Sequence, residues 1–207
     1  MSGSMSGRFL KGLLALLFLA MLAGGIARAI FFLPAQAEGN EMAPTIFRGE
    51  WVVAWLRASP SRGDVVLYED PHTKKRLRIG RVIGLPGEKV AFHNQIVSVS
   101  GREISRSQGQ PLAFDEEIAP GTRTLLLHTE KSPEGRTWRI LLDVRRRTKD
   151  LTIDAGDGFV LLGDNRNHAV DSRELGPIPR ARIKGVVRSR INPKEVRGIA
   201  PRGREVE

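Results

Sequence analysis

The chain opens with a long apolar stretch. Residues 10–27 are almost wholly apolar, interrupted only by Lys11 and small residues, and a second apolar cluster at 29–33 follows Arg28. Together the two clusters reach the roughly 20 apolar residues that an α-helix needs to cross a bilayer. We therefore predict a transmembrane signal anchor over residues 9–33.

Basic residues around this stretch predict its orientation. Arg8 and Lys11 precede the apolar run, which favours a cytoplasmic N-terminus over residues 1–8 and an extracytoplasmic main domain. The alternative is a cleaved secretory signal peptide, because residues 35–37 read Ala-Gln-Ala, a pattern typical of a cleavage site. We favour the uncleaved anchor, since Arg28 and the second apolar cluster separate the first apolar run from that pattern.

After the anchor, the pattern changes to short apolar runs bounded by Gly and Pro, which is typical of strands. We predict a hairpin from Lys89–His93 and Ile96–Val99, and a buried strand over 159–162. Further strands are expected at Trp51–Trp55, 65–68, 78–83 and Ile183–Ile191. The implied fold class is mostly β, with one N-terminal helix and a single domain over residues 34–193.

Residues 102–156 show the least regular pattern. We interpret them as a variable insertion on the domain, with strands at 123–128, 138–144 and 151–153. Pro111, Pro120 and Pro133 are each expected to lie beside a loop. Residues 194–207 are polar, and we predict a disordered tail there.

The alternation in Trp51–Trp55 places Trp51, Val53 and Trp55 on one face of a strand. Two interpretations of this face stay open. It lies either at a membrane interface, where Trp is enriched, or in the core of a sheet.

Composition and charge narrow the classes of partner. The chain has no cysteine, which excludes disulfides, and its formal net charge is +10. Arg8, Lys11 and Arg28 supply three of these charges, and the remaining excess favours contact with anionic phospholipid headgroups. No nucleic-acid-binding motif accompanies the charge, so we expect no nucleic-acid partner and interpret the arginines at 145–147 as a solvated loop.

A polar run at 163–173, Gly-Asp-Asn-Arg-Asn-His-Ala-Val-Asp-Ser-Arg, carries the candidate chemistry. Alone it is typical of a hydrogen-bonded turn. It becomes specific beside Met-Ala-Pro-Thr at 42–45 and Arg-Val-Ile-Gly-Leu-Pro-Gly-Glu-Lys-Val at 81–90, with Gly-Asp-Val-Val-Leu at 63–67 between them. In this order, the segments resemble the conserved boxes of the type I signal peptidases, the membrane serine proteases of the S26 family.

The resemblance covers roughly residues 13–193. It implies a signal-peptidase-like coiled β-sheet fold on one transmembrane helix in the plasma (inner) membrane. It also implies a groove that binds an extended signal peptide or surface-protein peptide along a sheet edge.

Four positions depart from the family's catalytic pattern. The resemblance assigns the nucleophilic serine to the position of Glu41 and the general-base lysine to that of Gly80. A serine that helps to build the oxyanion hole would stand at Gly39, and one that orients the lysine at Ala169. A serine attacks an amide only when a nearby base takes its proton, so this chain lacks the Ser/Lys pair. Glycine at 80 is expected to leave a void that a neighbour, water or a ligand group fills.

The positions that match the family are interpreted as a structural set. They are Met42, Pro44, Arg81, Gly84, Pro86, Gly87, Gly163, Asp164, Asn165, Arg166, Asp171, Ser172 and Arg173. We expect residues 84–87 and 163–173 to hold the substrate pocket and its floor. Arg81, Asp171 and Arg173 are expected to form one ion-pair network that specifies the geometry of the loop.

Neighbouring residues offer few substitutes for the missing base. On a regular strand Lys75 points to the face opposite to residue 80, and Lys74 lies about 20 Å away along the strand. Arg78 shares the face of residue 80, but its guanidinium stays protonated. Glu41 and Asp171 form a candidate acid–base pair, against which stands an ordinary ion pair between Asp171 and Arg173.

A metal site is not indicated. The four histidines, His72, His93, His128 and His168, show no ligand spacing, and we expect neither a metal nor another cofactor.

The leading hypothesis is a signal-peptidase-like membrane pseudoenzyme that binds extended signal or surface-protein peptides without Ser/Lys proteolysis. One alternative is an active type I signal peptidase, a serine-type endopeptidase that removes signal peptides from secreted preproteins. Another is a regulator that pairs with an active signal peptidase paralogue. The sequence leaves enzyme activity open between these hypotheses.

Overall fold

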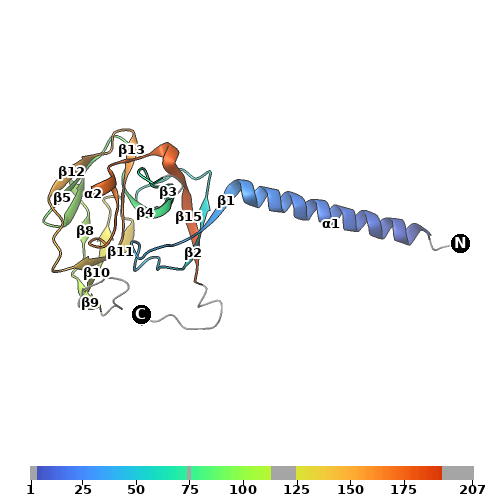
Figure 1. Ribbon diagram of the computed structural model, residues 1–207, viewed down its shortest axis with the longest axis horizontal. Coiled ribbons are helices and arrows are strands. Elements are labelled where there is room, and N and C mark those ends of the chain that lie inside the picture. Colours follow the sequence, from blue (N-terminus) through green and yellow to red (C-terminus); the bar gives the residue numbers. More distant parts are fainter. Residues whose placement is uncertain (1–3, 74–75, 113–124, 193–207) are drawn as a thin grey trace.

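The computed structural model describes residues 4–73, 76–112 and 125–192. A long helix, α1 (Ser4–Phe31), projects from a β domain that holds nearly all the other regular structure (Figure 1). The described leucines of α1 are exposed along its length. Among the described residues, no helix has the length and apolarity of a membrane span.

The helix ends before the apolar stretch does. β1 (Phe32–Gln36) follows α1 directly and pairs antiparallel with β2 (Trp51–Trp55), with Phe32 opposite Trp55 and Leu33 opposite Ala54. The predicted anchor extended to residue 33, because an apolar run alone does not distinguish a helix from a strand. Pairing with β2 takes the last two residues of that run into the domain.

A seven-stranded antiparallel sheet forms the centre of the domain, in the order β1-β2-β15-β3-β4-β13-β14. Its remaining strands are β3 (Val65–Glu69), β4 (Leu77–Gly84), β13 (Gly158–Leu162), β14 (Ile178–Pro179) and β15 (Ile183–Ile191). A short helix, α2 (Ser172–Leu175), and a 3-10 turn, Arg180–Arg182, lie between β13 and β15.

Two smaller sheets complete the domain. One follows the order β12-β5-β6-β7, and the other contains β11, β10, β8 and β9. Their bounds are β5 (Lys89–His93), β6 (Ile96–Val99), β7 (Arg102–Glu103), β8 (Ser105–Arg106), β9 (Gln110–Leu112), β10 (Leu125–Lys131), β11 (Thr137–Asp143) and β12 (Leu151–Asp154). The mostly β fold class is therefore confirmed.

Most predicted strands are present with shifts of one or two residues at their ends. The hairpin of β5 and β6 is confirmed, with Val90 opposite Val99. Pro111, predicted beside a loop, lies in the three-residue β9, an edge strand that pairs with β10. An edge strand tolerates proline because one side of its backbone needs no partner. Pro120 and the predicted tail at 194–207 lie outside the described residues.

The face of β2 that carries its tryptophans is exposed. Trp51 and Trp55 are 42% and 40% exposed, whereas Val52 and Ala54 are fully buried. The interpretation that the tryptophans form the sheet core is therefore wrong. The opposite face of β2 packs into the cluster that contains Met42 and Leu67.

The insertion at 102–156 shares its core with the rest of the domain. Trp138, Ile140 and Leu142 of β11 belong to one buried cluster with Ile83 of β4 and Val160 of β13. The insertion is thus packed against the central sheet by apolar side chains, and it supports the polar loop that follows β13.

Candidate functional site

The matching segments of the sequence meet at a buried ion pair. Arg81 on β4 donates from Nε to Asp164 Oδ1 at 2.7 Å and from Nη2 to Asp164 Oδ2 at 2.6 Å. Its Nη1 donates to the carbonyl of Gly63 at 2.7 Å, and the hydroxyl of Thr45 donates to Asp164. Four segments that are far apart in the sequence are therefore joined around one carboxylate.

Asp171 organises a second, separate ion pair. Its carboxylate accepts from the backbone N–H of Gly163 at 2.9 Å, and from Arg173 Nε and Nη2 at 2.8 and 2.7 Å. Asp171 also caps α2, and the Ser172 hydroxyl accepts from the N–H of Leu161 at 2.9 Å. The prediction of a single network is wrong, because Arg81 pairs with Asp164 rather than with Asp171.

A third buried pair was not predicted from the sequence. Arg166 donates with both Nη atoms to Glu130 on β10, and Trp138 Nε1 donates to Glu130 Oε2 at 2.9 Å. The side chains of Arg166 and Glu130 are 4% and 2% exposed. Glu130 lies in the insertion, outside the family motifs, and no spacing in the sequence indicates its partner.

The 39–45 segment is held against the polar loop through Glu41. Its carbonyl accepts from the N–H of Asn165 at 3.0 Å. A Cβ added at Gly163 would lie 2.6 Å from the Glu41 carbonyl oxygen and would overlap the Cβ of Ala169. Only glycine fits at 163, and its close approach brings the positions of Glu41 and Ala169 together.

The Glu41 side chain has a charged partner in place of a catalytic one. Its carboxylate is 31% exposed and lies 3.8 Å from Nη1 of Arg78 on β4. It also folds back over Gly39, where an added Cβ would lie 2.8 Å from Glu41 Cδ. A serine at 39 would require the Glu41 carboxylate to move.

The space beside Gly80 is filled by neighbouring side chains. Gly80 lies on β4 opposite Val66, and a Cβ there would be 3.2 Å from Tyr68 Cε1 and 3.3 Å from Leu161 Cβ. Tyr68, which is 1% exposed, is therefore a neighbour that packs against this space.

Tyr68 cannot act as a base at neutral pH. Burial raises the pKa of Tyr68 far above its usual value, and although Arg78 lowers it, the charges of Asp171, Asp70 and Glu41 raise it further. The phenol therefore stays protonated. Burial likewise opposes the charge of Arg78, but the hydrogen bond to Asp70 and the charges of Asp70 and Glu41 raise its pKa overall.

The other candidate catalytic groups have no catalytic arrangement. Lys74 and Lys75 lie outside the described residues. Glu41 and Asp171 have separate cationic partners, Arg78 and Arg173. Within the described part of the chain, no group of three or more His, Asp or Glu side chains is placed to hold a metal ion.

A groove runs between the segment after β1 and the first half of β4. Its lining residues are Gln36, Ala37, Glu38, Gly39, Glu41, Met42, Leu67, Arg76, Leu77, Arg78, Ile79 and Val170. β13 pairs with β4 only from Arg81 onward. Among the described residues, no strand pairs with that edge of β4 over residues 77–80.

Only some of the expected pocket residues lie at the groove. Met42 and Val170 line the groove, whereas residues 84–87 do not. Gly87 has φ of 82°, and its N–H donates to Gly156 at 2.7 Å. The predicted role of residues 84–87 in the pocket is therefore not seen. Gly84 ends β4, and residues 85–87 lie in the turn between β4 and β5.

Comparisons with known proteins agree with these motifs. The family model described as signal peptidase, peptidase S26, matches residues 10–192. The signal peptidase I of Streptococcus pneumoniae is 25% identical over 191 residues, which cover 87% of this chain and 91% of that protein. The signal peptidase I of Rickettsia massiliae is 29% identical over 58% of this chain, and the match spans only 47% of the Rickettsia protein.

A solved structure was also found. The signal peptidase I of Enterococcus faecalis aligns with a TM-score of 0.38 at 21% identity and covers 62% of this chain and 97% of that one.

Proposed function

The chain belongs to the S26 family of signal peptidases, and on this premise we propose that it is a signal-peptidase-like membrane protein without Ser/Lys proteolysis. In this proposal, the groove beside β4 binds extended signal or surface-protein peptides. The proposal is supported by what the structure places at the positions of the family's serine and lysine, residues 41 and 80. Glu41 is ion-paired with Arg78, and Tyr68 fills the space beside Gly80.

The groove supports binding without catalysis. An extended peptide can add to the open edge of β4 through backbone hydrogen bonds, with its side chains in the apolar lining of the groove. This needs neither a nucleophile nor a base. The ion pair of Arg81 with Asp164 ties β4 to the 163–173 loop, and Asp171 accepts from Gly163 within that loop. The close contact of Gly163 with Glu41 holds the 39–45 segment against the same loop.

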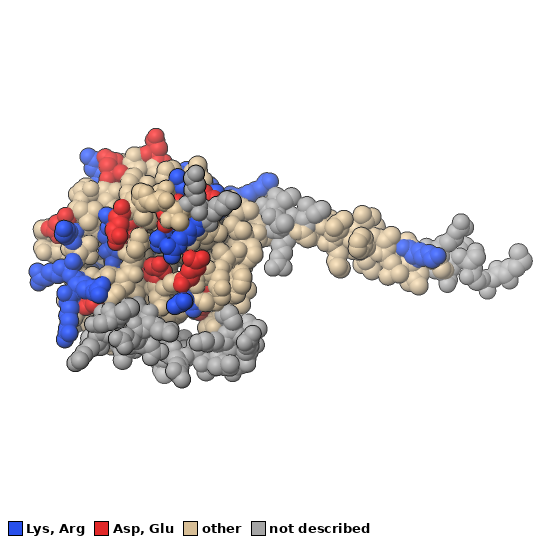
Figure 2. Space-filling model, in the orientation of Figure 1, with Lys and Arg blue, Asp and Glu red and all other residues tan. Residues whose placement is uncertain are grey.

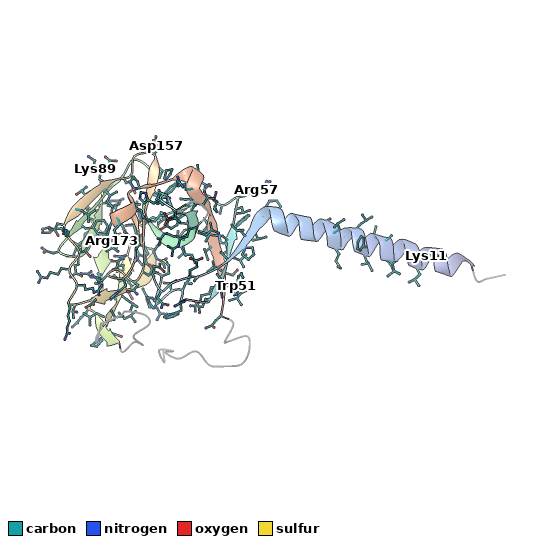
Figure 3. All side chains as sticks on the ribbon, in the orientation of Figure 1. Lys11, Trp51, Arg57, Lys89, Asp157 and Arg173 are labelled. Atoms are coloured by element: carbon teal, nitrogen blue, oxygen red, sulfur yellow. The ribbon has the colours of Figure 1, made fainter. Side chains whose placement is uncertain are left out.

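Membrane attachment through α1 is part of the same proposal. The exposed leucines of α1 are compatible with a lipid environment, and Lys11 and Arg57 lie near its two ends (Figure 3). On the face shown in Figure 2, the described part of the helix is mostly uncharged, with basic atoms towards its N-terminal end. We propose a single-pass anchor over residues 9–31 in the plasma (inner) membrane, with the domain that begins at β1 extracytoplasmic.

An active signal peptidase is the second candidate, and family membership favours it. It would remove signal peptides with a nucleophile and base other than a serine at 41 and a lysine at 80. A non-catalytic chain would instead bind its peptides, alone or beside an active signal peptidase paralogue.

Peptide binding to the groove is tested with a fluorescent peptide that carries an Ala-x-Ala sequence, and the full chain in detergent with phospholipid. Val170 lines the groove and is 38% exposed, and Ile96, outside the groove, is 37% exposed. Val170→Arg should weaken binding at least about tenfold, whereas Ile96→Arg should not. Equal affinity of the two variants would refute binding in this groove.

A further inference from the structure

Arg78 is held in a fixed position in the groove. Its Nε donates to Asp70 Oδ2 at 2.6 Å, and Asp70 is 2% exposed. The other oxygen of Asp70 accepts from the N–H groups of His72 and Thr73 at 2.8 and 2.9 Å. The carboxylate is thus anchored by backbone donors, and it orients the guanidinium before any ligand arrives.

The groove side of this guanidinium is only loosely occupied. Glu41 lies 3.8 Å from Nη1, which is beyond hydrogen-bond distance. Arg78 and Glu41 both line the groove, and their side chains are 12% and 31% exposed. The Glu41 carboxylate therefore makes only a weak ion pair with the Arg78 guanidinium. A carboxylate within hydrogen-bond distance of Arg78 can replace it.

We propose that this groove binds peptides by their free C-terminal carboxylate, which displaces Glu41 from Arg78. The inference rests on the proposed function and names its ligand class, a cleaved peptide rather than an intact preprotein. Nη1 and Nη2 of a guanidinium can donate side by side to one carboxylate, and such charge-assisted pairs are the stronger hydrogen bonds in proteins.

The position of Arg78 favours a chain end over an internal peptide bond. An internal bond presents a neutral carbonyl and has no charge to replace Glu41 on the guanidinium. The Glu41–Arg78 pair would then stay in place, in the groove that the peptide has to enter. A terminal carboxylate takes over the role of Glu41, so the peptide can lie along β4 and end at Arg78.

The test compares three fluorescent peptides on the full chain in detergent with phospholipid. The first two share one sequence that ends in Ala-x-Ala, and the third differs from it by a single internal residue. The first has a free carboxylate, the second has a C-terminal amide, and the third ends in an amide but carries an internal Asp. We expect the free acid to bind about tenfold or more tightly than either amide, as charge-assisted hydrogen bonds predict.

Two variants assign the effect to Arg78. Glu41→Gln removes the competing carboxylate without touching Asp70, so it should tighten binding of the free acid several-fold and leave the amide unchanged. Arg78→Gln should abolish the preference for the free acid. Arg76→Gln is its matched control, since Arg76 also lines the groove but is 44% exposed and pairs with Glu38. It should keep the preference.

Each other outcome is decisive. Equal binding of the free acid and the plain amide overturns this inference and leaves the proposed peptide binding intact. A preference for the internal Asp peptide overturns it too, because the carboxylate would then be recognised on a side chain. Failure of all three peptides to bind overturns both this inference and the proposed function.

Discussion

Tyr68 and a lysine at position 80 are predicted to compete for the same space, and a double-mutant cycle measures this. A Cβ at Gly80 would already lie 3.2 Å from Tyr68 Cε1 and 3.3 Å from Leu161 Cβ. Overpacking of this kind costs about 1–3 kcal/mol, and a lysine would also bury an ammonium group. We expect Gly80→Lys to lower the free energy of unfolding by about 3 kcal/mol or more.

Tyr68→Ala removes a fully buried aromatic side chain and should cost about 3–5 kcal/mol. If the two side chains compete, the lysine stem enters the space that Tyr68 leaves. The double variant should then be less destabilised than the sum of the two single variants, by about 1–3 kcal/mol.

The free energy of unfolding is measured by urea titration of the full chain in detergent, with tryptophan fluorescence as the signal. Phe92→Ala is the matched control, because Phe92 is 5% exposed and lies in a different buried cluster from Tyr68. Its effect should add to that of Gly80→Lys. Additivity of Tyr68→Ala with Gly80→Lys, within about 0.5 kcal/mol, would refute the claim that Tyr68 fills the lysine site.

Three further predictions concern the scaffold. Burial opposes the charge of Asp70, but hydrogen bonds from Arg78 and two backbone N–H groups lower its pKa from 3.8 to about 2. Its stabilisation is therefore complete above about pH 4 and is lost as the pH falls towards 2, so Asp70→Asn should flatten the unfolding free energy measured across that window. Gly163→Ala should destabilise by about 3 kcal/mol in urea unfolding, because its Cβ meets the backbone of Glu41 at 2.6 Å. Glu130→Gln leaves Arg166 without its buried partner, so it should cost about 3–5 kcal/mol and lower the Tm by about 6–20 °C in thermal unfolding.

Much of the β domain was predictable because its strands are short apolar runs between turn residues. β13, for example, is buried along its whole length and reads as an apolar run. The end of α1 was not predictable, because Phe32 and Leu33 continue the apolar pattern of the helix. Their pairing with β2 is a tertiary contact that the local pattern does not contain.

The candidate site was predictable as a set of positions but not as a set of contacts. The motifs identified Glu41 and Gly80 as the altered positions. They did not indicate that Tyr68, which is opposite Arg78 in the sheet, would fill the space beside Gly80. That outcome depends on strand register and side-chain packing.

The ion pairs show the same limit. Arg81, Asp164, Asp171 and Arg173 were all recognised, yet the sequence motifs did not specify which acid each arginine would contact. Glu130 was missed because it lies in the insertion, and its pairing with Arg166 arises only when β10 packs against the polar loop.

We propose that this signal-peptidase-like chain binds peptides but does not cleave them. The most direct test incubates the full chain, in detergent with phospholipid, with a preprotein that carries an Ala-x-Ala site, and follows the products by mass spectrometry. Without a serine at 41 and a lysine at 80, we expect no cleavage at that site. Cleavage after the Ala-x-Ala sequence by the unmodified chain, lost in the Glu41→Ala variant, would contradict it and establish an active peptidase.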